Sequence, residues 1–553
     1  MRFPELSDAL QRAVAELGFE GAIEVQLVRP PDRARGDLAT NVALALAARL
    51  GRAPRQVAES LVGRLDLDEL RIQEVEVAGP GFINFRLRPE ALLDRLREIV
   101  RADADYGRGS WGGGRSIVVE FVSANPTGPL HVGHGRGAAM GDVVARMLEW
   151  TGHRVHREFY VNDSGAQIEK LVDSVEARYR QLQGREASIP EGGYHGEYVK
   201  DLARALHAEG ARRLDGEWGE GEREAVRRRV LETMLADQEA DLGSCNVRID
   251  EFRRESDVYR SSRIREVLDL LEERGLLDHR EGAVWLRTTR FGDDKDRVLV
   301  KGDGTYTYFL PDIAYHMDKA ARGFEHAINV WGADHHGYVP RMQAAMEAVG
   351  LGRDFMEAII VQLVRVERGG EEVKFSKRAG EFVTLRDLVE EAGAEVTRYF
   401  FLERSPQQQM VFDLDLALER SEKNPLYKVQ YAHARIRSIY RKGEVEPESI
   451  EPDADLSGLD RPEELEIVKT LLDLPETLEG AARNREPHRL TNYLEGLANQ
   501  VNSWYHAGNR DRSLRVLGVG EDLEHARLNL SRGAEIVIRN GLNILGITAP
   551  ERM

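Results

Sequence analysis

The sequence predicts an α/β protein built around a doubly wound parallel sheet, with a smaller α/β module before it and an all-helical region after it. Residues 117–122 form a short apolar run rich in β-branched residues, which is typical of a buried parallel strand. Helical spacing follows at residues 140–148, and another strand pattern follows at 155–161, which is the strand–helix–strand order of a parallel sheet. From about residue 405 onward the pattern is helical, apart from an acidic loop at 444–462.

Length and composition limit the possible classes of protein. A chain of 553 residues is too long for one core, and the usual domain size suggests three or four domains. Hydrophobic residues make up 42% and charged residues 31%, and no apolar run is long enough to cross a bilayer. The N-terminus enters an amphipathic helix instead of an apolar signal segment. The single cysteine, Cys245, excludes an intramolecular disulfide and a cysteine-cluster zinc site. We expect a cytoplasmic protein that does not associate with membranes.

Residues 1–108 are expected to form a separate α/β module. An apolar face from Leu6 to Leu17 marks one helix, and residues 40–50 form a second, alanine-rich helix. The predicted strands are 23–28, 75–77 and 82–87. A glycine-rich connector at 107–114 then leads to the central strand.

The loop after the central strand has the features of an anion site. Residues 125–129 contain two prolines and a glycine, and the helix that follows begins with His131, Gly133 and His134. Free backbone N–H groups and the positive end of a helix dipole attract phosphate there, and two histidines can donate hydrogen bonds to phosphate oxygens. The alternative is a pair of histidines that simply caps a helix.

The flanking residues favour the phosphate interpretation. His131-Val132-Gly133-His134 resembles the HIGH motif of class I aminoacyl-tRNA synthetases. The run from Ser123 to Leu130, Ser-Ala-Asn-Pro-Thr-Gly-Pro-Leu, resembles the arginyl branch of that family.

A dinucleotide-binding site is an alternative interpretation of the same residues. Gly133-x-Gly135-x-x-Ala138 fits the relaxed fingerprint, and Glu158 lies where an acid that binds ribose is expected. In a dinucleotide-binding unit, however, the glycines follow the strand directly. Here about ten residues with two prolines intervene, which disfavours a nicotinamide-dependent enzyme.

The sequence predicts a helical insertion near residues 185–300, within the domain that contains the central strand. Its first part, to about 255, is mostly polar helix, with Tyr194, Tyr198, Leu202 and Leu206 at helical spacing. Residues 284–286 and 298–301 are short strands between charged turns.

Two later segments carry polar residues at strand-to-helix transitions. Tyr308 and Asp312 follow one of them, and Asp312 is also a candidate helix cap. Asp334, His335 and His336 follow the other, but adjacent side chains in an extended chain point to opposite faces and the helical ligand spacing is missing. We expect no structural metal.

A basic segment follows a further β-rich run at 358–366. Lys374-Phe375-Ser376-Lys377 resembles the KMSKS motif of class I synthetases, with Phe in place of Met. Many arginyl enzymes lack the second lysine, which this sequence keeps as Lys377. Thr384-x-x-Asp387 then predicts a capping box.

The C-terminal region resembles a DALR anticodon-binding domain, beginning at Asn424-Pro425-Leu426-Tyr427. The net charge of −18 by itself argues against a nucleic-acid partner. An acidic protein can still carry local basic clusters, however, and Arg435, Arg437 and Arg441 form a candidate cluster. Aromatic and arginine faces suit unstacked anticodon bases. The alternative is a helical bundle with buried tyrosines.

The resemblance to bacterial-type arginyl-tRNA synthetases extends over the whole chain. It implies an N-terminal tRNA-binding domain (1–108), a Rossmann-like catalytic domain (109–404) and an all-helical anticodon-binding domain (405–553). The implied reaction activates L-arginine with ATP and transfers it to the 3′ end of tRNA-Arg, releasing AMP and pyrophosphate. The implied partners are tRNA-Arg, L-arginine and ATP with Mg²⁺ as a substrate complex, and the protein is expected to be a monomer. A tRNA-binding paralogue that has lost activation remains the other alternative.

The resemblance also assigns roles to individual residues. His335 stands where some relatives have glutamine. The implied catalytic residues are His131, His134, Lys374 and Lys377; the ATP-binding residues are Thr127, His131, Gly133, His134, Phe375, Ser376 and Lys377; the arginine-binding residues are Glu120, Ser123, Asn125, Tyr308, Asp312 and His335; and the tRNA-binding residues are Tyr431, Arg435, Trp504 and Tyr505.

Overall fold

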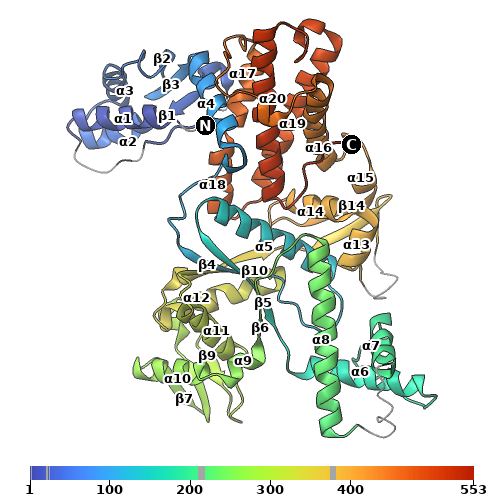
Figure 1. The fold of residues 1–553 in the computed structure, drawn as a ribbon. Helices are drawn as coiled ribbons and strands as arrows, with labels where there is room; N and C mark the ends of the chain where they lie inside the picture. The colour runs from blue at the N-terminus through green and yellow to red at the C-terminus, as the bar shows by residue number, and fades with distance from the viewer. Residues whose placement is uncertain (2, 20–22, 24, 31, 209–217, 374–381) are drawn as a thin grey trace.

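A five-stranded parallel sheet forms the centre of the molecule (Figure 1). The structure is a computed structural model that describes the whole chain except residues 2, 20–22, 24, 31, 209–217 and 374–381. The strand order is β11-β10-β4-β5-β6, and every neighbouring pair is parallel. The strands are β4 (Ser116–Glu120), β5 (Arg154–Val161), β6 (Glu251–Arg254), β10 (His326–Gly332) and β11 (Met356–Val361). This confirms the predicted α/β class.

Helices cover both faces of this sheet, because successive residues of β4 point to opposite sides. Ile117 and Val119 pack in one core with helix α5 (Val132–Trp150). Val118 packs in the other core, with Leu310 and Met342. The helices on that second face are α10 (Arg263–Glu273), α11 (Phe309–Ala321) and α12 (Val339–Ala348).

The N-terminal module contains a small antiparallel sheet of order β1-β3-β2. The predicted strand at 82–87 is confirmed as β3, whereas the predicted strand at 23–28 is wrong: among its described residues only Val28 pairs, with Ala39. The elements are α1 (Pro4–Glu16), η1 (Arg33–Arg35), β1 (Leu38–Thr40), α2 (Val42–Leu50), α3 (Pro54–Val62), β2 (Ile72–Ala78), β3 (Phe82–Leu87), α4 (Pro89–Ala102) and η2 (Asp103–Asp105).

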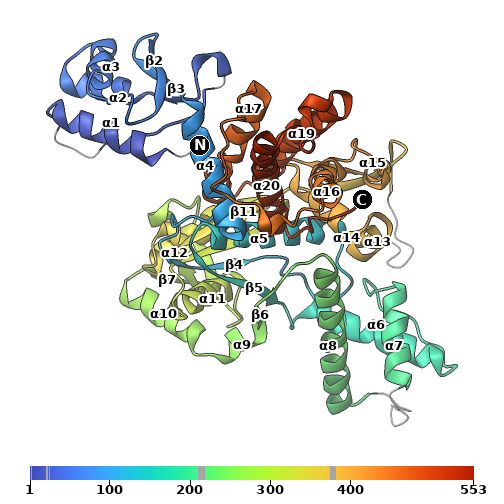
Figure 2. The same cartoon turned by 45° about the horizontal axis from the view of Figure 1, so that its top comes forward.

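The N-terminal module lies beside the C-terminal helices (Figure 2), and ion pairs join the two regions. Arg29 Nη1 lies 2.7 Å from Asp473 Oδ2, and Lys469 Nζ lies 2.5 Å from Asp37 Oδ1. The two RNA-binding regions implied by the sequence are therefore in direct contact.

Two satellite structures leave the main sheet. Helices α6 (Ala166–Leu182), α7 (Glu197–Ala208) and α8 (Glu220–Ser244) enclose their own core around Tyr179 and Trp218. An antiparallel sheet of order β7-β8-β9 lies beside α9 and α10. Within the range 185–300, β6 is the edge strand of the main sheet. The remaining bounds are α9 (Glu255–Arg260), β7 (Leu277–Arg280), β8 (Ala283–Leu286), η3 (Thr288–Phe291) and β9 (Arg297–Val300).

A third small sheet, of order β13-β12-β14, connects the central and C-terminal regions. Strand β14 was not predicted, since the sequence indicated helix after residue 405; it forms because it pairs in parallel with β12. The predicted capping box is confirmed: Thr384 Oγ1 accepts a 3.0 Å hydrogen bond from the backbone N–H of Asp387. The elements are η5 (Arg353–Phe355), β12 (Val364–Arg368), β13 (Glu371–Glu372), α13 (Leu385–Ala392), α14 (Ala394–Leu402), β14 (Met410–Asp413) and α15 (Leu414–Leu418).

The C-terminal region is a bundle of long helices, as predicted, and a buried arginine joins it to the sheet region. Arg398 of α14 is 1% exposed and donates to Asp142 of α5, to the carbonyls of Cys245 and Asn246, and to the carbonyl of Leu545, just beyond α20. The elements are α16 (Pro425–Gly443), η6 (Pro447–Ser449), α17 (Pro462–Leu471), α18 (Leu474–Asn484), α19 (His488–Arg510), η7 (Arg512–Leu514) and α20 (Glu521–Ile544).

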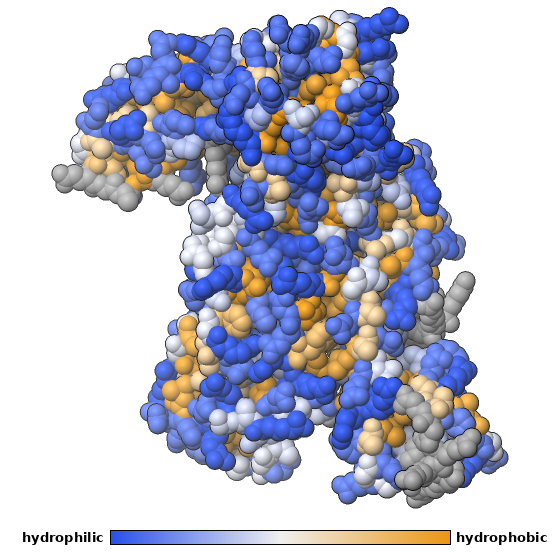
Figure 3. Space-filling view, in the orientation of Figure 1, coloured by the Kyte–Doolittle hydropathy of each residue, from blue (hydrophilic) through white to orange (hydrophobic). Residues whose placement is uncertain are grey.

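Hydrophilic residues cover most of the face shown in Figure 3, and apolar residues form small separate areas on it. Each helix in the described part of the chain is too short or too polar to span a membrane.

Candidate active site

The central strand ends in an unusual backbone turn at the site. Val122 and Ser123 have φ values of 69° and 41°, in the left-handed region that β-branched residues such as Val122 rarely occupy. The turn points Ser123 back toward the strand, where its hydroxyl donates 3.0 Å to Glu120 Oε1 and accepts 3.1 Å from the N–H of Tyr160. Strain of this kind is typical of functional sites.

The proline-containing loop after this turn is held by the helical satellite. Asn125 Nδ2 donates 2.7 Å to Gln167 of α6, and Asn125 Oδ1 accepts 2.8 Å from Asn162. The carbonyl of Thr127 accepts 2.9 Å from Tyr198 of α7. The loop that the sequence predicted to bind ATP and arginine is therefore fixed by residues outside the main sheet.

His131 and His134 face each other at the N-terminus of α5. His131 Nδ1 accepts 3.2 Å from the backbone N–H of His134, and His134 Nδ1 accepts 3.4 Å from the backbone N–H of His131. Their rings stack with centroids 3.6 Å apart and planes 19° apart. The histidines do cap the helix, and the capping contacts also fix both rings.

These contacts determine which ring nitrogen carries the proton. Because each Nδ1 accepts a hydrogen bond, each neutral ring must carry its proton on Nε2. Burial lowers the pKa of His131, and burial together with the neighbouring His131 lowers the pKa of His134 to about 3. Both rings are therefore neutral at pH 7 and keep an Nε2–H for donation to a phosphate oxygen.

The glycines beside the histidines allow close packing. A Cβ atom at Gly133 would lie 2.9 Å from the His131 ring, and one at Gly135 would lie 2.6 Å from Leu385 of α13. The chain returns here after residues 374–381, since the Leu385 N–H donates 2.8 Å to the carbonyl of Leu130. The predicted phosphate-binding residues Lys374, Phe375, Ser376 and Lys377 lie outside the described residues.

A cavity of about 880 Å³ opens beside the end of β4. Five of the six residues predicted to bind arginine line it: Glu120, Ser123, Tyr308, Asp312 and His335. The sixth, Asn125, is not on the wall but is bonded to Asn162, which is. Residues far apart in sequence thus converge on one cavity.

Asp312 is the central acid of this cavity. It lies within α11, which begins at Phe309, and no side chain caps that helix; Asp312 Oδ2 instead accepts 2.6 Å from the hydroxyl of Tyr338. Burial raises the pKa of Asp312 to about 7, the Tyr338 hydrogen bond opposes this, and the charges of Glu120 and Glu255 raise it further. The capping alternative for Asp312 is wrong.

The two other acids of the cavity, Glu120 and Glu255, differ in whether a cationic side chain already pairs with them. Glu120 is 6% exposed, and its Oε2 accepts 2.5 Å from Lys319 and 2.8 Å from Asn329, so its charge is already compensated. Glu255, at the start of α9, is 7% exposed, and burial raises its pKa. Sequence reasoning missed Glu255 and Tyr338, because no motif marks either and only the fold brings them to the cavity.

Two predicted residues lie at the cavity mouth. Tyr308 is the residue directly before α11, and it is 81% exposed. His335, in η4 (Ala333–Tyr338), has a 51% exposed side chain that lies 3.4 Å from Asp334 and packs near Trp331. Neither is enclosed with Asp312.

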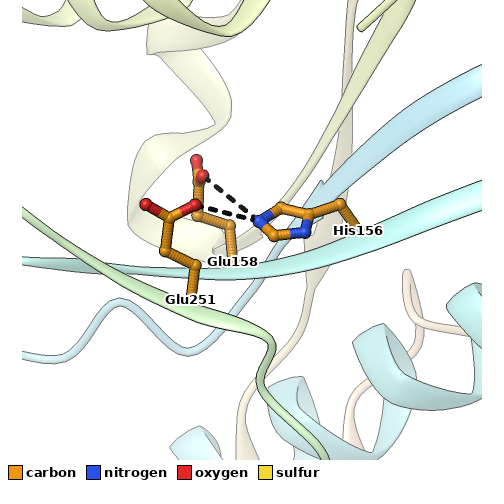
Figure 4. Close-up of side chains that lie close together, drawn as sticks. All are labelled: His156, Glu158 and Glu251. Atoms are coloured by element: carbon orange, nitrogen blue, oxygen red, sulfur yellow. Dashed lines mark hydrogen bonds and ion pairs between the residues drawn. The ribbon is translucent and has the colours of Figure 1, made fainter. Parts of the chain in front are cut away.

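Glu158 is buried and paired with protein side chains. It lies with His156 and Glu251 in the one cluster of metal-ligand type among the described residues (Figure 4). Arg322 donates to both carboxylates, and Tyr315 donates to Glu158. A guanidinium thus supplies the positive charge here, and the acid required by the dinucleotide alternative is already paired.

The residues predicted to bind tRNA divide into two groups. The Arg435 guanidinium lies 5.7 Å from the ring centroids of both Tyr431 and Tyr505, and it donates to Asn502 and Glu422 at 2.5 Å each. Trp504 lies on another side of α19 and is 8% exposed. Its indole N–H donates a 3.3 Å hydrogen bond to Glu464 of α17. The structure brings the first three together and separates Trp504 from them.

Three family models match the chain in sequence order. They are the arginyl tRNA synthetase N-terminal domain (residues 4–87), the class I tRNA synthetase (R) catalytic domain (96–415) and the DALR anticodon-binding domain (429–553).

Individual relatives agree with these models over nearly the full chain. An arginine–tRNA ligase of Bacillus licheniformis is 44% identical over 99% of both chains, and one of Desulforudis audaxviator is 46% identical over 99% of this chain and 97% of its own. The arginyl-tRNA synthetase structure from Thermus thermophilus superimposes with a TM-score of 0.79 at 26% identity, covering all of both chains. The chain therefore belongs to the arginyl-tRNA synthetase family of class I, whose members join arginine to tRNA at the expense of ATP.

Proposed function

We propose that the 880 Å³ cavity holds the substrate arginine, with Asp312 as the acceptor of its guanidinium. The observation that carries this is a half-buried carboxylate on the cavity wall, with a raised pKa and no cationic side chain bonded to it in the described structure. A guanidinium offers five N–H donors in a fixed fork, and it restores the ionised form of such an acid.

The surrounding residues divide the remaining tasks. Glu255 adds a second carboxylate near Asp312, and Tyr308 and His335 contact arginine from the cavity mouth. Asn125 and Ser123 bind the α-amino and carboxylate end, at the strained end of β4. Glu120 acts through its hydrogen bond to Ser123, since Lys319 and Asn329 hold its other oxygen.

ATP binds at the N-terminus of α5 in this proposal. Thr127, Gly133 and the two Nε2–H groups of His131 and His134 face its phosphates. The proposal also assigns to ATP the residues Lys374, Phe375, Ser376 and Lys377, which precede α13 in the sequence. Mg²⁺ arrives with ATP as part of the substrate. The arginine carboxylate then attacks the α-phosphorus and pyrophosphate leaves, which requires positioning and charge stabilisation but no covalent enzyme intermediate.

The RNA partner is tRNA-Arg, bound across the N-terminal module (1–108) and the helical region (405–553). Tyr431, Arg435 and Tyr505 form the face for unstacked anticodon bases. Trp504 stabilises α19 through its hydrogen bond to Glu464 of α17. The protein acts as a monomer in the cytoplasm.

Exchange of labelled pyrophosphate into ATP tests the active-site assignment. We expect exchange that depends on arginine and on added tRNA-Arg, and that Asp312→Asn suppresses at limiting arginine. Aminoacylation of tRNA-Arg by the same preparations is the second readout. Arginine-dependent exchange that is equal in the variant and the parent contradicts the cavity assignment. Charging without any exchange contradicts the adenylate route.

A further inference from the structure

Exposed aromatic side chains are concentrated at one place on the described surface. Only four of the Phe, Tyr and Trp residues in the described part of the chain are exposed: Phe82 at 43%, Tyr259 and Tyr306 at 42% each, and Tyr308 at 81%. Three of these four belong to the segments that border the 880 Å³ cavity. Water-exposed aromatic groups gathered in one place indicate a binding surface.

The local folds of two segments bring these rings together. Tyr259 lies four residues after the cavity residue Glu255 on α9, so both lie on one face of that helix. Its ring is nearly parallel to that of Tyr306, with centroids 6.3 Å apart and an angle of 19°. Burial, and then the charges of Glu255 and Asp312, raise the pKa of Tyr259 to about 12, which is consistent with its place beside the cavity.

The turn under Tyr306 is fixed by its own hydrogen bonds. Asp303 Oδ1 accepts from the N–H and the hydroxyl of Thr305 at 2.9 and 2.6 Å. Tyr306 pairs with Val300, and the Thr307 hydroxyl donates 2.8 Å to the carbonyl of Val298. Thr307 is thus tied to β9 while the Tyr306 ring stays in solvent, so the ring is preorganised for a partner.

Cationic side chains flank the two rings. Arg260 follows Tyr259 directly, with its side chain 76% exposed, and exposed Lys301 begins the turn that carries Tyr306. Aromatic faces with adjacent positive charge are the combination that binds single-stranded nucleic acid.

We propose that Tyr259 and Tyr306 form a stacking platform for the terminal adenosine of the tRNA. The inference rests on the proposed arginine cavity: the terminal ribose must reach the arginine carboxylate, so the attached base must lie next to the cavity mouth. That base is unpaired, and aromatic stacking is how proteins bind unpaired bases. ATP carries the same base, but its phosphates are assigned to the start of α5.

Equilibrium binding of two tRNAs to the full-length protein tests the platform. One is intact tRNA-Arg and the other lacks only its 3′-terminal nucleotide. In the parent protein we expect the intact tRNA to bind roughly tenfold more tightly, within the range of base–aromatic stacking. Tyr259→Ala and Tyr306→Ala should reduce this ratio toward one, mainly by weakening binding of the intact tRNA, whereas Tyr306→Phe should retain it.

Matched measurements separate this result from other causes. Phe82→Ala removes the fourth exposed aromatic ring, in the N-terminal module, and should leave the ratio unchanged even if it weakens both tRNAs. Equal loss for both tRNAs in the Tyr306→Ala protein, or equal binding of both tRNAs to the parent, overturns the platform. A raised Michaelis constant for ATP with an unchanged ratio also overturns it and assigns the rings to ATP. The Michaelis constant for arginine in Asp312→Asn tests the cavity separately.

Discussion

The hydroxyl of Tyr338 donates a 2.6 Å hydrogen bond to Oδ2 of Asp312, across 26 residues of sequence and between two different elements. This bond fixes the carboxylate while leaving its other oxygen free of any partner among the described residues. An acid held in this way can receive a guanidinium without moving.

Asp312→Asn should therefore impair arginine use more than ATP use. The amide removes the charge and leaves a buried guanidinium poorly compensated, a loss of roughly 3–5 kcal/mol by analogy with broken buried ion pairs. Steady-state kinetics with arginine and ATP varied separately will measure it. An unchanged Michaelis constant and turnover for arginine would remove Asp312 from the site.

The raised pKa of Asp312 predicts a pH dependence. In the free enzyme the acid ionises near pH 7, so kcat/KM for arginine should fall about tenfold per pH unit below that value as the carboxylate takes up a proton. The Asp312→Asn protein should lack this step. A profile that is flat from pH 5.5 to 7.5 in the parent protein contradicts the prediction.

The raised pKa of Asp312 also makes the free energy of unfolding depend on pH. The folded-state pKa lies above that of an unfolded aspartate, so the folded protein binds more protons between about pH 4 and 7. The contribution of this group to the free energy of unfolding is present below that window and is lost as pH rises through 7. Without arginine, Asp312→Asn should raise the melting temperature more at pH 8 than at pH 5.

His134→Ala should reduce turnover by roughly 10²–10³, the usual cost of removing one donor aimed at developing charge. The Michaelis constant for arginine should change less, because the ring lies at the start of α5 and not on the cavity wall. Single-turnover formation of arginyl-adenylate is the direct measurement, and melting temperature controls for the lost cap. Intact turnover would disprove the assignment.

On the role that the sequence predicts for Lys377 at the ATP phosphates, Lys377→Ala should lower turnover in activation much more than it weakens ATP binding, since a contact of that kind strengthens as pyrophosphate leaves. We also expect activation by this protein to require tRNA even though Lys377 is present. Pyrophosphate exchange with and without tRNA-Arg measures both points. Strong exchange without tRNA would contradict the second point and leave the family assignment unaffected.

Arg435 and Trp504 should respond differently to substitution. Tyr505→Ala or Arg435→Gln should weaken tRNA-Arg binding by about 1–3 kcal/mol, because Arg435 lies over both tyrosine rings. Trp504→Phe removes the hydrogen bond to Glu464 and part of a buried ring, so it should cost roughly 1–3 kcal/mol of stability and leave tRNA affinity unchanged. Filter binding and thermal unfolding distinguish these effects, and weaker tRNA binding by Trp504→Phe would contradict the division.

Local features of the site were predictable from sequence, and long-range ones were not. The strand, loop and helix from Ile117 to Trp150 follow from periodicity and turn residues, as does the Thr384 cap. The pairing of Asp312 with Tyr338, the burial of Glu255 and the strand β14 depend on contacts between distant segments. Asp312 was a candidate cap and a candidate ligand on spacing alone, and only the tertiary contact decides against the cap.

Arg398 has a consequence for how the protein can be divided. One guanidinium satisfies a carboxylate of the histidine-bearing helix and a carbonyl at the end of the last helix. The backbone at Leu545 is therefore part of the structural support of the active-site helix. Domain recombination that exchanges the helical region as a module must also supply that carbonyl, or it leaves a buried charge incompletely solvated beneath α5.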